Sequence, residues 1–184
     1  MDRVTDAFIW PFRDPEWPAK IAVIGLILLI PIVGAVNGLG WMLAALDRLR
    51  AGEERLPPAN FSYLGRGLSL FAANLFYYLL ALLFLSFSIL SVGYLALTFA
   101  TPSIVLAVSR GGIAGGLRVD GVMRSVRRSL VNTLIAGLML IAAHFVASLG
   151  LFVCGIGVVF TNAYALAMQA WIVRSFEIGP PEAG

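Results

Sequence analysis

The sequence predicts an all-α protein that crosses a membrane about five times, and three observations support this. Of its 184 residues, 60% are hydrophobic and 12% are charged, whereas soluble domains carry about 25% charged residues. Asp, Glu, Lys and Arg are absent from three long stretches, 21–46, 67–109 and 129–173. One helical crossing takes about 20 residues, so the first stretch fits one crossing and the others fit two each. We therefore expect a single membrane domain over residues 1–184.

Residues 1–20 form the first predicted element, a collar that lies at the membrane surface. Its charged residues alternate with large apolar side chains, namely Phe8, Ile9, Trp10, Phe12 and Trp17. Tryptophan is enriched where the headgroups of a bilayer meet water. We therefore expect these side chains to lie at the interface and to fix the depth of the first span.

The first span is predicted over residues 21–46, and Pro31 leaves two forms open. Pro31 divides the stretch into apolar pieces of 10 and 15 residues, each shorter than one crossing. A helix kinked by the proline would cross the membrane and leave the N-terminus outside. A re-entrant turn would instead return the chain to its starting side and place every Lys and Arg there. Gly34 and Gly38 predict close helix packing in either form.

Two helical hairpins are predicted over residues 67–109 and 129–173, with turns near 88–92 and 150–157. A single helix of 43 residues would be about 65 Å long, roughly twice the thickness of the hydrocarbon layer. Ten of the thirteen basic residues lie in the two charged loops and in the tail, 174–184. Because basic loops favour the cytoplasmic side, we expect these loops and the C-terminus in the cytoplasm and the protein in the inner (cytoplasmic) membrane.

A basic amphipathic helix is predicted over residues 113–128, between the hairpins. At 100° per residue its apolar side chains form one stripe, made of Val119, Val122, Met123, Val126 and Leu130. The other side and its border carry the candidate lipid-headgroup residues Arg118, Arg124, Arg127 and Arg128. Such a helix lies in the membrane plane, and an anionic surface attracts each Arg by about 1 kcal/mol. Anionic lipid is therefore the expected partner; a connector whose arginines only set topology is the alternative.

Few side chains inside the apolar stretches could support chemistry. His144 is the only His within them, and all ten acidic residues lie outside them. A catalytic triad needs an acid to orient its histidine, and a zinc site needs about four ligands. We therefore expect no enzyme activity, metal or cofactor. The amides Asn74, Asn162 and Gln169 are interpreted as groups that hydrogen-bond helices together, with a narrow polar pathway as the alternative.

Three segments resemble a known family: WPFRDPEWPAKIAVIGLILLIPIVG, RLRAGEERLPP and GIGVVFTNAYALAMQAWIVRSF. Their motifs are Pro-Phe-x-Asp-Pro-x-Trp at Pro11 to Trp17, Ile-Pro-Ile-x-Gly at Ile30 to Gly34, and a Leu-Pro pair at Leu56. They are similar to the polytopic membrane family of bacteria and archaea called domain of unknown function 4013. The resemblance covers most of the chain and implies a multi-pass membrane protein, but it implies no activity, substrate or site residue.

The basic helix and the lack of catalytic groups together predict a non-enzymatic membrane module. We expect it to contact anionic lipid and either to self-associate or to join a larger membrane complex. The alternative is a small oligomeric channel or carrier for an uncharged solute, with the three amides along its path. Nucleic acid is not an expected partner, because the net charge of +3 comes from residues at the predicted membrane edges.

Overall fold

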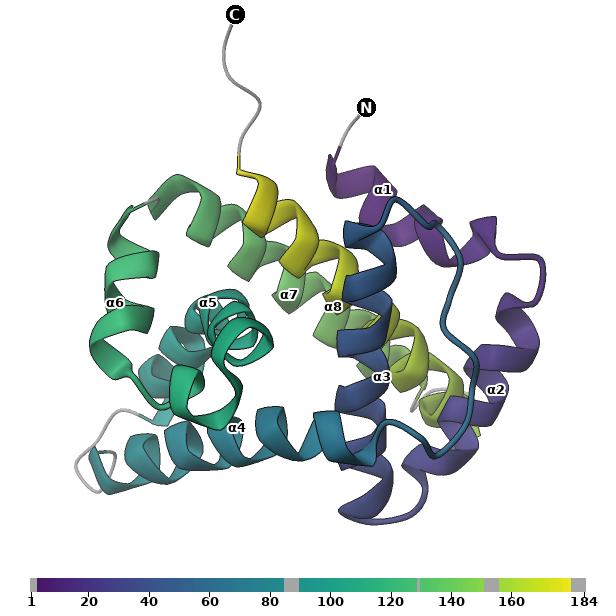
Figure 1. Ribbon diagram of the computed structural model, residues 1–184, viewed down its shortest axis with the longest axis horizontal. Coiled ribbons are helices and arrows are strands. Elements are labelled where there is room, and N and C mark those ends of the chain that lie inside the picture. The colour runs from purple at the N-terminus through teal and green to yellow at the C-terminus, as the bar shows by residue number, and fades with distance from the viewer. Residues whose placement is uncertain (1–2, 85–89, 129, 151–155, 180–184) are drawn as a thin grey trace, which may run out of the picture.

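The computed structural model describes residues 3–84, 90–128, 130–150 and 156–179. Across these ranges the chain has eight α-helices, one short 3-10 helix and no strand (Figure 1), which confirms the all-α prediction. The helices are α1 (Arg3–Ile9), η1 (Trp10–Arg13), α2 (Trp17–Leu28), α3 (Val33–Arg50), α4 (Leu64–Phe84), α5 (Leu90–Gly116), α6 (Val119–Arg128), α7 (Leu130–Leu149) and α8 (Ile156–Ile178).

Residues 21–46 are folded back on themselves between α2 and α3. The chain reverses at Ile32, which has φ 63° and ψ −61°, and the N–H of Val33 donates to the carbonyl of Pro31 at 2.7 Å. This is a γ-turn of the rarer, strained kind. Gly34 lets α3 approach α2 here, because a Cβ atom at that position would collide with the carbonyl oxygen of Ile27. Of the two forms left open for this stretch, the structure has the folded-back one (Figure 1).

The open end of this hairpin is held by Asp14. Its carboxylate accepts hydrogen bonds from Lys20 Nζ at 2.8 Å, from the N–H of Glu16 at 2.9 Å and from the N–H of Leu56 at 2.8 Å. Burial alone would raise the pKa of Asp14, but these three hydrogen bonds and the Lys20 charge outweigh it and lower the pKa. The N-terminal segment and the loop after α3 therefore lie at the same end of the molecule.

The N-terminal segment packs against α8 rather than lying free at a surface. Trp10 is fully buried, its Nε1–H donates to the carbonyl of Ala167 at 3.2 Å, and its ring stacks on Trp171 at 6.2 Å between centroids. The predicted role of Trp10 as an interfacial anchor is therefore wrong. Small buried residues of α8, including Ala163 and Ala170, leave the room that the indole ring fills. Phe12 remains half exposed, as an anchor would.

The two predicted hairpins correspond to α4 with α5 and to α7 with α8, whereas the basic helix is shorter than predicted. Of the predicted turns near 88–92 and 150–157, residues 88–89 and 151–155 lie outside the described residues, whereas 90–92 belong to α5 and 156–157 to α8. The chain breaks at Gly112, where φ is 58° and ψ is −153°, and again before α6 begins. Residues 113–116 form a separate helical turn after Gly112, and the chain leaves the helix again at Leu117 and Arg118, so the helix predicted over 113–128 is confined to Val119–Arg128.

Gly34 and Gly38 pack helices of this same chain. A Cβ atom added to Gly38 would meet the side chains of Leu28 in α2 and Leu166 in α8 within 2.9 Å. A contact missed in the sequence lies further along α3, where Gly40 faces Gly67 of α4 and each would collide with the other helix's backbone if it carried a side chain. These glycines allow α3 to contact α2, α4 and α8 at once.

Two outer surfaces are rich in exposed apolar side chains. Among the described residues, the segments Leu97–Gly116 and Leu130–Leu149 are long and apolar enough to cross a membrane, and α2 is apolar but shorter. The α7 surface, more than a third exposed at each position, consists of Leu130, Val131, Leu134, Ile135, Leu138, Ile141, Phe145 and Leu149. The hairpin tip, equally exposed, consists of Leu26, Leu29, Ile30, Ile32 and Val33. Patches of this extent on a protein surface mark contact with a membrane or a partner.

Candidate functional site

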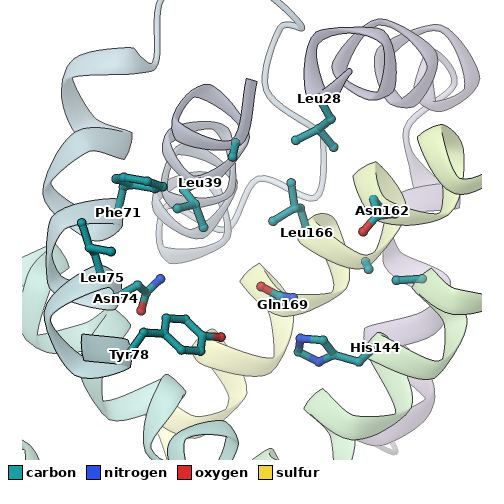
Figure 2. A pocket seen from close by; sticks show the side chains of 13 residues that line it. Leu28, Leu39, Phe71, Asn74, Leu75, Tyr78, His144, Asn162, Leu166 and Gln169 are labelled. Atoms are coloured by element: carbon teal, nitrogen blue, oxygen red, sulfur yellow. The ribbon is translucent and has the colours of Figure 1, made fainter. Parts of the chain in front are cut away.

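A cavity of about 380 Å³ lies among α3, α4, α7 and α8. Its polar lining comes from distant parts of the chain: Asn74 from α4, His144 from α7, and Asn162 and Gln169 from α8. Figure 2 shows the side chains of Asn74, Tyr78, Gln169 and His144 directed toward one another across the cavity. The three amides singled out in the sequence are thus brought to one cavity, together with the histidine.

Helix periodicity explains why α8 supplies two of these groups. Asn162, Leu166 and Gln169 are spaced by four and three residues, so they lie along one face of the helix, and all three line the cavity. A smaller neighbouring cavity of about 210 Å³ shares Asn74, His144 and Gln169 with the first. It adds hydroxyl groups from α5, of which Thr101 donates to the carbonyl of Leu97 at 2.9 Å. The polar lining therefore continues from α8 toward α5.

The hydrogen bond made by His144 fixes which nitrogen of the neutral ring can act as an acceptor. Its Nδ1 lies 2.7 Å from the carbonyl oxygen of Leu140. A carbonyl only accepts, so Nδ1 carries the proton, and in the neutral ring Nε2 is left with a free lone pair. The neutral His144 therefore offers an acceptor at Nε2.

The cavity amides retain unused hydrogen-bonding capacity. Asn162 Nδ2 donates to the carbonyl of Val158, one turn earlier in α8, at 2.8 Å. Within the described part of the chain, the side chains of Asn74 and Gln169 make no hydrogen bond. Each amide has two donors and one acceptor with two lone pairs. These groups would be costly to leave unpaired in an apolar, water-free setting, so the cavity suits a polar guest.

The described lining of both cavities contains no Asp, Glu, Lys or Arg. Over the described residues, no group of three or more His, Cys, Asp and Glu side chains is placed to hold a metal ion. An acid that could orient His144 for nucleophilic catalysis is likewise missing from that lining. The arrangement is suited to hydrogen bonding with a neutral molecule.

The basic helix α6 presents its arginines outward. Arg118, Arg124, Arg127 and Arg128 are all exposed, whereas Val122 on the opposite side is buried. Arg124 pairs with Asp120 one turn earlier at 2.8 Å. The other three form no ion pair with any residue of the described ranges. Most of the protein's other basic residues are paired with acids. Lys20 pairs with Asp14 at the open end of the α2–α3 hairpin, and Arg50 and Arg110 both pair with Glu177.

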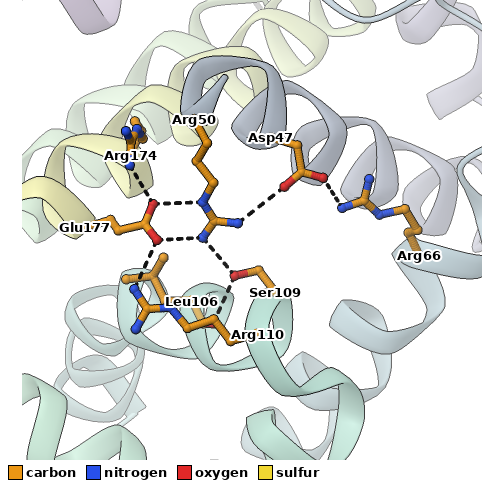
Figure 3. Close-up of polar contacts among 8 residues, drawn as sticks. All are labelled: Asp47, Arg50, Arg66, Leu106, Ser109, Arg110, Arg174 and Glu177. Carbon is orange, nitrogen blue, oxygen red and sulfur yellow. Dashed lines mark hydrogen bonds and ion pairs between the residues drawn. The ribbon is translucent and has the colours of Figure 1, made fainter. Parts of the chain in front are cut away.

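Glu177 of α8 is the centre of an ion-pair cluster (Figure 3). Arg50 of α3 donates to its two carboxylate oxygens at 2.8 and 2.9 Å, and Arg110 and Arg174 each lie 3.0 Å away. Burial alone would raise the pKa of Glu177, but the hydrogen bonds and charges of these arginines outweigh it and lower the pKa to about 2. The Glu177 cluster, defined by these four residues, joins the ends of α3 and α8 to α5.

Sequence reasoning missed the Glu177 cluster. The only signal in the sequence was Glu177 itself, an acid in the last turn of an apolar helix. The local sequence does not indicate that its partner is Arg50, 127 residues earlier. Comparison with models of protein families, with curated proteins and with solved structures finds no match for this chain. The candidate sites therefore rest on the geometry of the cavity, of α6 and of the Glu177 cluster.

Proposed function

We propose that this chain is a multi-pass integral membrane protein that acts without catalysis and contacts anionic lipid through α6. The α7 surface supports the membrane location, since eight large apolar side chains would otherwise be exposed to water along one helix. The α4–α5 and α7–α8 hairpins would supply the crossings. The α2–α3 hairpin would enter the bilayer without crossing it, because α2 has 12 residues and is only about 18 Å long.

The proposed topology places the charged segments on one side, the cytoplasmic side of the inner membrane. Arg13 pairs with Glu54 at 2.6 Å, and Arg50 pairs with Glu177, so the N-terminal segment, the first part of the loop after α3 and the end of α8 share one end of the molecule. The apolar hairpin tip points the other way, and Figure 1 has α1 and the end of α8 near the same edge. Basic loops on one side agree with the positive-inside rule.

The single observation that carries the lipid proposal is the pairing state of the arginines in α6. Arg118, Arg127 and Arg128 are exposed and have no acidic partner among the described residues. On the same helix Met123 and Val119 are exposed, as expected of a helix that lies in the interface with apolar groups in contact with acyl chains. Phosphate headgroups would supply the missing anions.

Lipid retention by the detergent-extracted protein tests this proposal. Native mass spectrometry would compare bound phosphatidylglycerol with bound phosphatidylcholine, in the wild type and in a variant with Arg118, Arg124, Arg127 and Arg128 changed to Gln. We expect the variant to lose most of its preference for phosphatidylglycerol. Arg55→Gln is the matched control, because Arg55 is also exposed and lies outside α6. An unchanged preference in the fourfold variant would defeat the lipid proposal.

The same spectra report the assembly state. We propose that the protein works either as a homo-oligomer or as a subunit of a larger membrane complex, and the exposed apolar α7 surface, which could contact a partner helix as well as lipid, supports this. Extraction from the native membrane should give a mass above that of one 184-residue chain. A strictly monomeric mass after gentle extraction would count against both forms of association.

A second candidate function, a small oligomeric carrier or channel for an uncharged solute, is favoured by one observation. Asn74, Asn162 and Gln169 line one cavity with His144. Flux of a neutral solute such as glycerol into proteoliposomes would test it. Loss of that flux when the three amides are changed together to Leu would support the pathway, and flux that survives the change would remove these residues from it.

A further inference from the structure

We propose that the cavity among α3, α4, α7 and α8 binds a neutral hydroxyl-bearing amphiphile, a long-chain alcohol in the simplest case, taken up from the bilayer. This inference rests on the proposed membrane location and goes beyond the lipid contact made by α6. The cavity differs from α6 in the groups that it offers to a ligand: its polar lining consists of amides and an imidazole, whereas α6 offers arginines. It would therefore bind a neutral molecule from the bilayer, which the arginines of α6 would not recognise.

The cavity opens sideways between α4 and α7. Leu75 and Tyr78 of α4 line the cavity and yet remain 47% and 55% exposed. His144 on α7 also lines it and is exposed. Next to His144, Phe145 belongs to the exposed α7 surface that would face acyl chains. A guest would therefore enter from the hydrocarbon layer and keep its apolar body near that surface.

The hydrogen-bonding groups of the cavity match a hydroxyl group. The Nε2 atom of neutral His144 is an acceptor, since Nδ1–H is committed to Leu140, so it needs a donor from the guest. The amides of Asn74 and Gln169 supply N–H donors, which need an acceptor. A hydroxyl is both donor and acceptor at one oxygen, so one such group can satisfy the histidine and an amide together.

Charged amphiphiles fit the cavity poorly. A carboxylate would have no Lys or Arg in the described lining, and an ammonium group would have no Asp or Glu. Burying an unpaired charge in an apolar site is strongly unfavourable. A plain hydrocarbon would fill the space but leave the amides of Asn74 and Gln169 and the Nε2 atom of His144 without partners. The cavity volume of about 380 Å³ lies at the small end of the range for ligand pockets, which suits a head and part of a chain.

Photolabelling in proteoliposomes tests this inference. Three probes with the same diazirine on a sixteen-carbon chain would be compared: hexadecanol, hexadecane and palmitate. Labelled residues would be located by peptide mass spectrometry. We expect hexadecanol to label Tyr78 and His144 roughly tenfold more than the other two probes, because it alone can donate to His144 and accept from an amide without burying a charge. All three probes should label the outer face of α7 around Leu138 to a similar extent.

Two kinds of variant separate ligand loss from misfolding. Asn74→Leu with Gln169→Leu removes two hydrogen-bonding groups and should lower the hexadecanol excess roughly tenfold. Ala35→Phe fills the cavity from α3, where Ala35 is exposed and lines it, and should abolish the excess. Val33→Phe is the matched control, because Val33 is exposed two residues away and is not part of the lining; it should keep the wild-type pattern.

The outcomes distinguish this inference from the membrane proposal on which it rests. Equal labelling of Tyr78 and His144 by hexadecanol and hexadecane would overturn the hydroxyl site while leaving the membrane location intact. A hexadecanol excess that Ala35→Phe leaves unchanged would place the alcohol elsewhere and would also overturn it. Absence of labelling around Leu138 with every probe would instead reject the membrane location itself.

Discussion

Arg50 at the end of α3 and Glu177 in the last turn of α8 are joined at two points, from Nε to Oε2 at 2.8 Å and from Nη2 to Oε1 at 2.9 Å. The planar guanidinium matches the carboxylate in this arrangement, which gives geometric specificity as well as energy. The Glu177 side chain is 14% exposed. The contact therefore fixes the end of α8 against the folded-back N-terminal hairpin.

Replacing Glu177 should destabilise the fold. Glu177→Gln leaves Arg50, Arg110 and Arg174 close together without their shared acid, and breaking such a partly buried pair costs on the order of 3 kcal/mol. Thermal unfolding in detergent micelles would measure the change. Glu16→Gln is the control, since Glu16 is 75% exposed and its loss should have little effect. Equal stability of the two variants would contradict the role of the cluster.

Stability should fall in acid because of the same residue. The pKa of Glu177 is about 2 in the folded protein against its usual 4.5, so the folded state favours the ionised form. Its contribution is complete above about pH 4.5 and is lost as the pH falls toward 2. We expect the wild type to lose stability between pH 5 and 2 more steeply than Glu177→Gln. Some slope should remain in the variant, because the pKa of Asp14 is also lowered; parallel slopes would refute the prediction.

The N-terminal segment should be accessible from the same side of the membrane as the C-terminal end. Single cysteines at Glu16, Glu53 and Ile178, in a Cys154→Ala background, would be labelled with a membrane-impermeant maleimide in sealed vesicles of known orientation. All three positions are exposed, and we expect all three to react from one side. A cysteine at Leu29 in the hairpin tip should react from neither. Reaction of the Glu16 position from the opposite side would refute the proposed one-sided topology.

Gly34 should be among the least replaceable residues of the hairpin. Gly34→Ala would place a methyl group against the backbone carbonyl of Ile27, and because backbone cannot rotate away we expect a loss of about 2 kcal/mol or more. Gly65→Ala is the matched control: nothing lies within 4 Å of its added Cβ, and Ala is the better helix former. Unfolding in micelles would compare them, and a Gly34→Ala variant as stable as Gly65→Ala would rule out the close approach.

Hydropathy and helix periodicity were sufficient for the parts of the fold that depend on local sequence. The two longer uncharged stretches correspond to α4 with α5 and to α7 with α8. The arginines of α6 are exposed as its 100° periodicity predicted, and of the predicted apolar stripe Val122 is buried, whereas Val119 and Met123 are exposed. The limits of α6 were missed because the chain turns at Gly112 and again at Leu117 and Arg118, and hydropathy does not register a turn.

The remaining features depend on residues far apart in the chain. Pro31 alone could not decide between a kink and a reversal, since the reversal is held by the contact of Asp14 with Leu56, 42 residues away. Tryptophan is typical of interfacial anchors, yet Trp10 packs against α8 and donates to the carbonyl of Ala167, 157 residues later in the chain. The amides were visible as a set, but their convergence with His144 on one cavity follows only from the packing of α3, α4, α7 and α8.

The one-sided placement of charge bears on how the chain enters its membrane during synthesis. In the proposed topology the segments that must pass into the bilayer, 21–46, 67–109 and 129–173, contain no Asp, Glu, Lys or Arg. Moving a charge through the membrane potential involves about 2.3 kcal/mol per 100 mV, and here no such charge moves. Insertion should therefore proceed equally well in energised and de-energised membranes, driven by the apolar surface of the hairpins alone.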